Sequence, residues 1–274
     1  MPAPATSERR TLERARHRAL VIMPAYNEAE SIGSVLAEFP DQASGLDVLV
    51  VSDGSTDDTA AVARAGGAIV VELPFNLGIG GALRAGFAYA MRHGYGCAVQ
   101  FDADGQHDPS QIRRLLDIVE QGADLVIGSR FAPGGTVSYP VGRIRRLAMR
   151  FLSLLVRSFA GQTFSDTTCG FRAFSRPMLE LFATTYPVEY LDNVEALVLA
   201  CNGGFRVEEI GVNVWARRAG TPSASRASKL AYFYLRLVIV LVVTASRERT
   251  RVRRRAARDE PAARPSAVQQ PVAM

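Results

Sequence analysis

Short apolar segments alternate with longer amphipathic segments over the first half of the chain. Five segments are nearly continuous in apolar residues, as is typical of strands that are buried on both faces of a sheet: residues 19–23, 48–51, 69–72, 98–101 and 125–127. Four intervening segments place their apolar residues at helical spacing: residues 30–39, 56–65, 80–93 and 109–121. The alternation predicts an α/β fold, in which a mostly parallel sheet carries helices on both faces.

An arginine-rich segment follows a stretch of glycine and proline after Gly128. The helical spacing of residues 143–160 separates three arginines from four apolar residues, namely Arg146, Arg150 and Arg157 from Leu147, Phe151, Leu154 and Leu155. A basic amphipathic helix of this kind is suited to lie in a membrane interface. The alternative is an ordinary surface helix that packs on the sheet.

A second apolar segment, residues 230–246, contains Arg236. A spanning helix needs about 20 apolar residues, and a central arginine costs roughly 2.5–3.5 kcal/mol on insertion. We therefore expect an interfacial or re-entrant helix rather than a span; a helix docked on the domain is the alternative. The expected organisation is a basic flexible N-terminus, one α/β domain, a C-terminal apolar interfacial helix and a disordered basic tail: residues 1–18, 19–220, 221–250 and 251–274.

The charges of the chain are concentrated at its ends. The chain has 274 residues, of which 48% are apolar and 22% charged, a balance that excludes wholesale disorder. Residues 1–18 carry five Arg and two Glu, and residues 247–274 carry eight Arg and three acids, so the body between them is net acidic. The basic ends suggest an anionic partner such as lipid headgroups or nucleic acid; the alternative is that they only make the chain more soluble. The first 18 residues contain no apolar run, so we expect no secretory signal peptide.

Two carboxylates and a carboxamide follow the fourth predicted strand. Asp102, Asp104 and Gln106 occupy alternate positions where the strand ends in a turn, so their side chains can converge on one point. Such oxygen ligands suit Mg²⁺ or Mn²⁺, which takes substrate phosphates at its other positions. Parallel α/β sheets bind ligands outside the carboxyl ends of their strands. We therefore expect a metal and diphosphate site here, with a solvated turn as the alternative.

Polar residues also follow the first two predicted strands. Tyr26 leaves the first strand and could stack on a base, while Asp53 leaves the second and could accept hydrogen bonds from a base or a ribose. Ser55 or Thr56 would cap the next helix. The glycine-rich turn at residues 76–81 either presents backbone amides to a phosphate or merely fits a tight loop. With the acidic turn after the fourth strand, these residues indicate a nucleotide-diphosphate site.

Taken together, these motifs resemble the family 2 glycosyltransferases of the GT-A fold, and most of all the branch of dolichyl- and polyprenyl-phosphate sugar synthases. The resemblance covers roughly residues 19–220. It is carried by the motifs PAYNE (24–28), SDGSTDDT (52–59), NLGIGGALRAG (76–86), FDADGQH (101–107), GSRF (128–131) and DTTCGFRAF (166–174). It implies a GT-A, Rossmann-like sheet, a hexosyltransferase activity and a divalent metal cofactor.

The resemblance also implies roles for individual residues. The donor would be bound by Pro24, Tyr26, Glu28, Asp53 and Asp102. The metal and the diphosphate would be held by Asp102, Asp104 and Gln106. The acceptor phosphate would meet Arg130 and either Arg145 or Arg146. Asp166 and the following residues 170–172 match the acceptor and sugar side of the cleft.

The implied reaction is the inverting transfer of a hexose from a UDP- or GDP-sugar to a polyprenyl or dolichyl phosphate at the cytoplasmic membrane face. Asp104, Arg130 and Asp166 would form the catalytic centre, and Asp166 would be the base if the acceptor were a hydroxyl. The expected partners are the nucleotide sugar, the lipid phosphate, an anionic membrane surface and a separate flippase or membrane protein, but no nucleic acid. The alternatives are transfer to a hydroxyl of a glycolipid or cell-envelope polysaccharide, a nucleotidyltransferase, and a non-catalytic membrane-associated scaffold.

Overall fold

The computed structural model describes residues 18–39, 46–138, 142–188 and 192–216, with the backbone alone for residues 143–145. Most of the expected domain at residues 19–220 is therefore described. The expected N-terminal segment before Arg18, the apolar helix at residues 221–250 and the tail at residues 251–274 lie outside the described residues.

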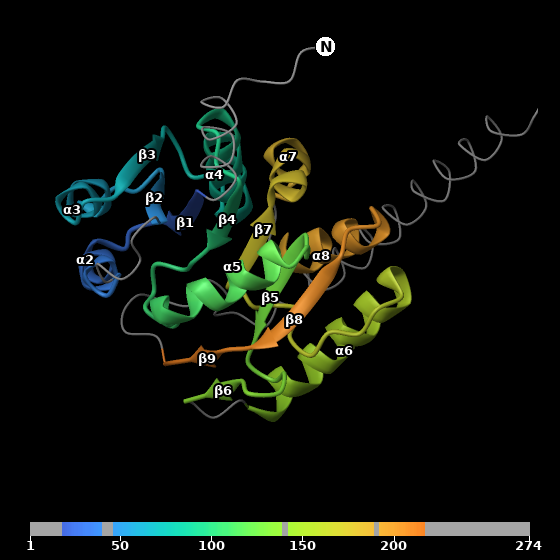
Figure 1. Ribbon diagram of the computed structural model, residues 1–274. Helices are drawn as coiled ribbons and strands as arrows, with labels where there is room; N and C mark the ends of the chain where they lie inside the picture. Colours follow the sequence, from blue (N-terminus) through green and yellow to red (C-terminus); the bar gives the residue numbers. More distant parts are fainter. Residues whose placement is uncertain (1–17, 40–45, 139–141, 189–191, 217–274) are drawn as a thin grey trace, which may run out of the picture.

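A seven-stranded mixed sheet runs through the centre of the molecule (Figure 1). Its strand order is β3-β2-β1-β4-β7-β5-β8, and β7 alone of these seven runs antiparallel to its neighbours. The strands are β1 (Ala19–Ala25), β2 (Leu46–Asp53), β3 (Ile69–Leu73), β4 (Cys97–Gln100), β5 (Leu125–Ser129), β7 (Arg172–Ser175) and β8 (Val207–Gly211). The reversed direction of β7 brings its first residue to the edge where the other six strands end.

The five strands expected from the sequence are all present, whereas β7 and β8 had no sequence prediction. Two further short strands, β6 (Thr136–Val137) and β9 (Asn213–Val214), pair in parallel beside the carboxyl edge of the main sheet. They follow β5 and β8 directly, so the second, smaller sheet extends the edge at which the polar motifs gather.

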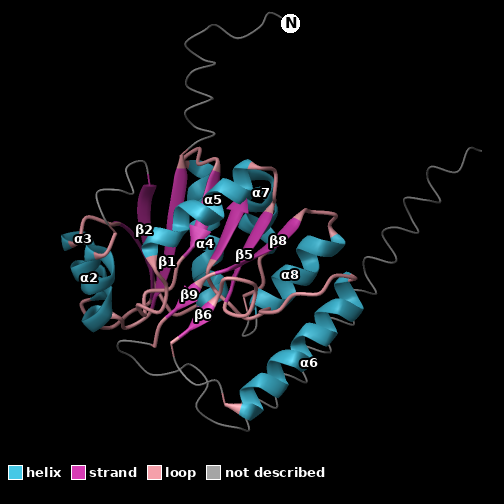
Figure 2. Ribbon diagram, turned by 60° about the horizontal axis from the view of Figure 1, so that its bottom comes forward, coloured by secondary structure: helices cyan, strands magenta, loops and turns pink. Residues whose placement is uncertain are grey.

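Helices cover both faces of the sheet, as the alternation of apolar segments predicted (Figures 1 and 2). The apolar side chains on one face pack against α2 (Ala29–Ala37), α3 (Thr59–Ala65) and α5 (Ile112–Glu120). Those on the other face pack against α4 (Ile79–Arg92), α6 (Arg143–Ala160), α7 (Arg176–Thr185) and α8 (Asp192–Asn202). A 3-10 turn, η2 (Pro109–Gln111), leads into α5, and Asp108 caps this turn by accepting a hydrogen bond from Ser110 N at 2.9 Å.

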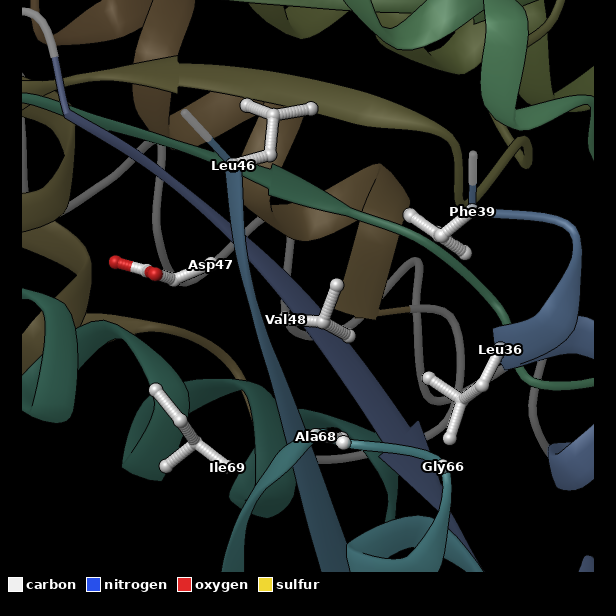
Figure 3. Close-up of a pocket in the computed structure, with 9 residues that line it drawn as sticks. Leu36, Phe39, Leu46, Asp47, Val48, Gly66, Ala68 and Ile69 are labelled. Atoms are coloured by element: carbon white, nitrogen blue, oxygen red, sulfur yellow. The ribbon is translucent and has the colours of Figure 1, made fainter. Parts of the chain in front are cut away.

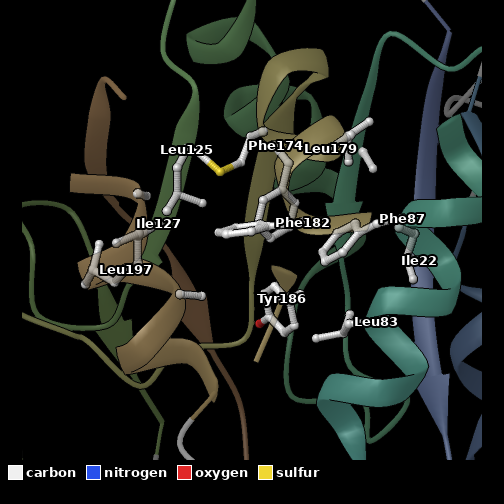
Figure 4. Close-up of a cluster of buried hydrophobic side chains, with 14 of the residues drawn as sticks. Ile22, Leu83, Phe87, Leu125, Ile127, Phe174, Leu179, Phe182, Tyr186 and Leu197 are labelled. Carbon is white, nitrogen blue, oxygen red and sulfur yellow. The ribbon is translucent and has the colours of Figure 1, made fainter. Parts of the chain in front are cut away.

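An aromatic cluster joins α4 and α7 to the sheet (Figure 4). The ring of Phe87 lies 4.9 Å from that of Phe174 and 5.2 Å from that of Tyr186, both in edge-on geometry. Helix α4 comes close to β1 because Gly86 has no side chain; a Cβ there would overlap the side chain of Ile22. This packing fixes the helices that carry the loops of the carboxyl edge.

Helix α6 has the bounds that the sequence predicted, but its faces differ from the prediction. Leu152 and Val156 are buried, Leu155 packs with them, and the helix contacts α8 along this side (Figure 2). The outer side carries both classes of residue that we expected to be separate: Arg146, Arg150 and Arg157 with Leu147, Phe151 and Leu154. The separation was wrong because packing on α8 selects one apolar stripe and leaves another facing outward.

Within the described residues, none of the helices combines the length and the hydropathy that a membrane crossing requires. A hollow of about 210 Å³ opens where β2 and β3 begin (Figure 3). Its lining includes Leu36, Phe39, Leu46, Asp47 and Ile69. It lies at the amino-terminal edge of the sheet, opposite the edge that carries the polar motifs, so it plays no part in the site described next.

Candidate active site

Side chains tie the loops after β1 and β2 together. Asn27 adopts a left-handed backbone with φ of 53°, accepts a hydrogen bond from Thr56 N at 2.8 Å and donates its own N–H to Ser55 Oγ at 3.2 Å. Ser55 or Thr56 was expected to cap α3, and that expectation was wrong: the helix starts later, after Asp58, and it is Asp57 Oδ1 that accepts a hydrogen bond from Thr59 N, at 3.0 Å. The two residues instead join the loops predicted to hold the nucleoside.

Asp53 is buried at the end of β2, where its Oδ1 accepts a hydrogen bond from Leu77 N at 2.8 Å. Burial raises the pKa of Asp53, and the backbone N–H groups of Leu77 and Gly78 oppose that rise. The amides at the start of the glycine-rich turn therefore point at Asp53. Of the two alternatives for this turn, the contacts favour a tightly fitted loop over a phosphate cradle.

The three other residues predicted to contact the nucleoside lie at the same edge. Tyr26 is 49% exposed, so its ring is accessible from solvent, while Pro24 is half-buried at the end of β1. Glu28 accepts a hydrogen bond from Ser31 Oγ at 2.6 Å, within the first turn of α2. These positions leave the ring of Tyr26 as the exposed flat surface beside Asn27 and the β2 loop.

Asp102, Asp104 and Gln106 lie on one tight turn after β4. Asp104 is buried and its Oδ1 accepts a hydrogen bond from Gln106 N at 3.0 Å, which closes the turn. The side chain of Asp102 is 27% exposed, and His107 Nε2 lies 3.6 Å from its Oδ2. Gln106 Nε2 donates to the carbonyl of Trp215 at 3.2 Å, so the amide oxygen Oε1 is turned away from that carbonyl. The turn thus collects three oxygen-bearing side chains of the kind that hard divalent cations prefer.

His107 directly follows this turn and lies in the interior of the protein. It is buried, its ring centroid lies 5.0 Å from that of Phe171, and its backbone forms a bridge with Val214. Its imidazole therefore contacts Asp102 from the buried side and packs against the rings of Phe101 and Phe171.

Gly170 packs directly against Asp102. A Cβ placed on Gly170 would lie 2.7 Å from Asp102 Oδ2, 3.0 Å from Oδ1 and 3.1 Å from Gln100 Nε2. Only a residue without a side chain fits here while Asp102 keeps its position. The segment that enters β7 therefore forms one wall of the acidic turn, across a sequence separation of 68 residues.

Arg130 and Asp166 form a buried ion pair next to this wall. Arg130 Nε donates to Asp166 Oδ2 at 2.5 Å, and Nη2 donates to Oδ1 at 2.7 Å and to Thr168 Oγ1 at 3.0 Å. Burial alone would raise the pKa of Asp166, but hydrogen bonds and charge from Arg130 hold it below its usual value. Asp166 is therefore held as a carboxylate with little tendency to accept a proton.

Cys169 is buried in the segment that joins Asp166 to Gly170. Burial raises the pKa of its thiol to about 12, and the negative charges of Asp166 and Asp102 add to that rise while Arg130 opposes it. The same segment carries both the carboxylate that pairs with Arg130 and the glycine that packs on Asp102, so the structure brings the predicted metal side and the predicted acceptor side together.

Arg172 is fully buried and structural, although the sequence motif placed it on the acceptor side. Its guanidinium donates to the backbone carbonyls of Thr167, Cys169 and Asn193 at 2.9, 2.9 and 2.8 Å. It therefore joins the loop before β7 to the start of α8. Arg146 is exposed on the outer side of α6, and the side chain of Arg145 lies outside the described residues.

Asp192 was missed by the sequence analysis. It is buried at the start of α8, its Oδ2 accepts a hydrogen bond from Tyr186 Oη at 3.0 Å, and burial raises its pKa to about 6, with a further contribution from the charge of Asp102. The only signal in the sequence was an acidic residue at a helix start, which ordinarily stabilises a helix N-terminus at the surface.

A comparison with known protein families identifies the family to which this chain belongs. The family described as glycosyl transferase family 2 matches residues 20–182. The chain belongs to glycosyltransferase family 2. The matched residues run from β1 to α7 and include the turn after β4, the ion pair of Arg130 and Asp166, and the loop that enters β7.

Two curated relatives of this family-2 chain act on polyprenyl phosphates by name. A polyprenol monophosphomannose synthase of Mycolicibacterium smegmatis is 35% identical over 221 residues, 77% of this chain and 83% of that protein. An undecaprenyl-phosphate mannosyltransferase of Micrococcus luteus is 41% identical over 163 residues, 57% of this chain and 66% of that protein.

A solved structure of the same fold is the glucosyl-3-phosphoglycerate synthase of Mycobacterium tuberculosis, in complex with Mn²⁺, UDP-glucose and phosphoglyceric acid. It has a TM-score of 0.64 and 25% identity, and the match covers 89% of this chain and 85% of that one. The GT-A fold expected from the sequence is confirmed by this similarity.

Proposed function

We propose that this glycosyltransferase moves a hexose from a nucleotide-diphosphate sugar to a polyprenyl phosphate, with inversion at the anomeric carbon and with the help of a divalent cation. The acidic turn of Asp102, Asp104 and Gln106 at the carboxyl edge of the sheet carries the proposal. The 35% identity to a polyprenol monophosphomannose synthase supports the choice of acceptor.

The residues of the acidic turn fit a divalent cation. Their donors are hard oxygens, Gln106 turns its amide nitrogen toward Trp215, and Gly170 leaves room for the carboxylate of Asp102. Asp102, Asp104 and Gln106 would hold Mg²⁺ or Mn²⁺, which would neutralise charge on the departing nucleoside diphosphate. The neighbouring synthase, solved with Mn²⁺ and UDP-glucose, supports a metal of this class.

The other residues of the edge position the donor. Tyr26 offers an exposed ring on which a base can stack, and Asp53 and Glu28 lie in the adjoining loops. The hydrogen bonds that Asn27 makes to the β2 loop give these residues a fixed geometry. A nucleotide sugar whose nucleoside is held by these fixed loops would present the anomeric carbon of its hexose to the acceptor without any movement of the sheet or its loops.

The state of Asp166 favours a phosphate acceptor over a hydroxyl. A hydroxyl acceptor needs a base, and Asp166 is a poor one because Arg130 binds both of its oxygens and lowers its pKa. A phosphate monoester already carries about 1.5–2 negative charges at pH 7, so it can attack without a base. Arg130, with Arg145 or Arg146 from α6, would attract that phosphate.

The outer side of α6 supports a location at a membrane. It carries three exposed arginines between the exposed apolar side chains of Leu147, Phe151 and Leu154. Basic and apolar groups on one surface suit an anionic lipid interface. We propose that α6 rests on the cytoplasmic face of the membrane, where a separate flippase or membrane protein would receive the product.

The decisive experiment compares acceptors with radiolabelled GDP-mannose and UDP-glucose as donors. Polyprenyl phosphate should accept label with release of the nucleoside diphosphate, while the matching polyprenol should not. Transfer to polyprenol, or to phosphoglyceric acid as in the neighbouring structure, would replace the proposed acceptor. Release of pyrophosphate would indicate a nucleotidyltransferase. No nucleotide-sugar binding in calorimetry with Mn²⁺ would leave the scaffold alternative.

A further inference from the structure

Trp215, the single tryptophan of the chain, lies beside the acidic turn and is 45% exposed. The residues after β8 run alongside the residues after Asp104. Trp215 N donates to the carbonyl of Gln106 at 2.8 Å, and Gln106 Nε2 donates to the carbonyl of Trp215 at 3.2 Å. A main-chain atom and a side-chain atom of Gln106, a proposed metal ligand, therefore both bind the backbone of Trp215.

The register of this pairing determines which way the indole projects. His107 and Val214 form an antiparallel bridge, so Gln106 lies opposite Trp215. Opposite residues of an antiparallel pair project to the same face, with Cβ atoms roughly 4.5–5.5 Å apart. His107 and Val214 are both buried and occupy the inner face. Gln106 and Trp215 therefore share the outer face, where the cation would bind.

We propose that the indole of Trp215 contacts the hexose of the bound donor and forms one wall of the sugar subsite. This inference rests on the proposed function. The hexose is joined to the diphosphate that the cation would hold. If Gln106 binds that cation, the hexose is the part of the donor that comes next to Trp215, the residue paired with Gln106. An indole suits such a group, because its faces cover the C–H surface of a sugar and its Nε1–H can donate to a hydroxyl.

The position of Trp215 favours the sugar over the lipid chain. Its contacts are with the acidic turn, whereas the exposed apolar residues suited to lipid, Leu147 and Leu154, lie on α6. Binding sites commonly combine a few polar groups with an aromatic wall. An exposed indole on the residue that pairs with Gln106 has this arrangement.

Fluorescence tests the proposal directly, because all tryptophan emission of the chain comes from Trp215. The full chain is titrated with GDP-mannose or UDP-glucose in the presence of Mg²⁺. The sugar nucleotide that binds should shift the emission to shorter wavelength and protect the indole from acrylamide. The matching nucleoside diphosphate should protect it much less. Equal protection by both ligands, or protection by polyprenyl phosphate alone, would overturn the proposal.

Two variants provide an independent test by calorimetry. Trp215→Ala should weaken binding of the nucleotide sugar about tenfold, while Trp215→Phe keeps an aromatic wall and should bind within a few-fold of the wild type. Binding of the nucleoside diphosphate should be unchanged in both. Phe151→Ala, which removes an aromatic side chain of the same exposure, 45%, from α6, is the matched control and should leave donor binding unchanged.

The outcomes separate this inference from the proposed function. If Trp215→Ala weakens the nucleotide sugar and the nucleoside diphosphate equally, the residue acts by holding Gln106, and the sugar contact is wrong. If Trp215→Ala binds the nucleotide sugar as the wild type does, the contact is also wrong, although the glycosyltransferase assignment stands. If the wild type binds no nucleotide sugar at all, the proposed function fails together with the inference.

Discussion

Arg130 binds Asp166 through two parallel hydrogen bonds, at 2.5 and 2.7 Å, in a pair from which solvent is almost excluded. The geometry is the bidentate one that guanidinium and carboxylate prefer. Such a pair adds little net stability, but removing one partner leaves a buried charge and costs about 3–5 kcal/mol. The pair therefore fixes the loop before β7 against the end of β5, and the folded protein needs both Arg130 and Asp166 to avoid an unpaired buried charge.

The first prediction concerns acid stability. The pKa of Asp166 is lowered in the folded chain, so its contribution to folding is present above about pH 4 and is lost as the pH falls through the folded value. Asp166→Asn removes this dependence. Urea unfolding between about pH 2 and pH 7 should show a steeper acid loss in the wild type than in the variant. Parallel curves would mean that Arg130 does not hold the carboxylate ionised.

Asp192 should have the opposite pH dependence. Its folded pKa of about 6 lies above the model-compound value of 3.8, so the folded chain favours the protonated form. Its contribution is greatest below about pH 4 and is lost as the pH rises through about 6. Relative to Asp192→Asn, the unfolding free energy of the wild type should fall by about 2–3 kcal/mol over that range. An equal pH slope in both proteins would contradict the prediction.

Gly170→Ala should displace Asp102 and slow sugar transfer. The new Cβ would lie 2.7 Å from one oxygen of Asp102 and 3.0 Å from the other, so the carboxylate has to move. A displacement of this size should lower kcat roughly 10- to 100-fold. Gly142→Ala is the control, because among the described residues no atom beyond its chain neighbours lies within 4 Å of a Cβ there. A Gly170→Ala enzyme with normal kcat would show that Asp102 does not need its observed position.

Asp104→Asn should abolish transfer while the protein stays folded. The amide oxygen can still accept the hydrogen bond from Gln106 N, so the turn is retained and the charge is lost. We expect a loss of roughly 100-fold or more in kcat, measured with saturating Mn²⁺ and donor. Asp108→Asn, which keeps an acceptor for Ser110 N, should have normal activity. Wild-type transfer by the Asp104 variant would disprove the metal site.

Helix α6 should control binding to lipid vesicles. Arg150→Glu reverses a charge on its outer side, and each basic residue near an anionic surface contributes about 1 kcal/mol. Sedimentation with phosphatidylglycerol vesicles should show weaker binding, and salt should reduce the difference between variant and wild type. Arg92→Glu, in the last turn of α4, is the charge-matched control. Equal losses in the two variants would mean that α6 is not the lipid-facing element.

The sequence predicted the first five strands of the sheet because they are continuous apolar segments flanked by polar turns. It gave no prediction for β7, because Arg172 interrupts the apolar pattern, and that arginine is buried only because three backbone carbonyls surround it. Strand β8 was also missed, since Glu208 and Glu209 give it the composition of a surface loop.

The candidate site was predictable where its residues lie close together in sequence. Asp102, Asp104 and Gln106 share one turn, so their spacing alone indicated a common ligand. The contacts of Gly170 with Asp102 and of Trp215 with Gln106 join residues 68 and 109 positions apart. No local pattern encodes such contacts, because they depend on the reversed direction of β7 and on the pairing that follows β8.

The antiparallel direction of β7 determines which residues of the site a shorter fragment of the chain would contain. The four strands that precede β5 bring to the carboxyl edge only the loops proposed to bind the donor. The wall at Gly170 and the partner of Arg130 arrive when the chain turns back through β7, after residue 165. A fragment that stops at the end of α6 would keep the loops after β1, β2 and β4 and yet lack Asp166 and Gly170, so we expect that the two parts of the proposed site could not be exchanged between relatives as separate modules.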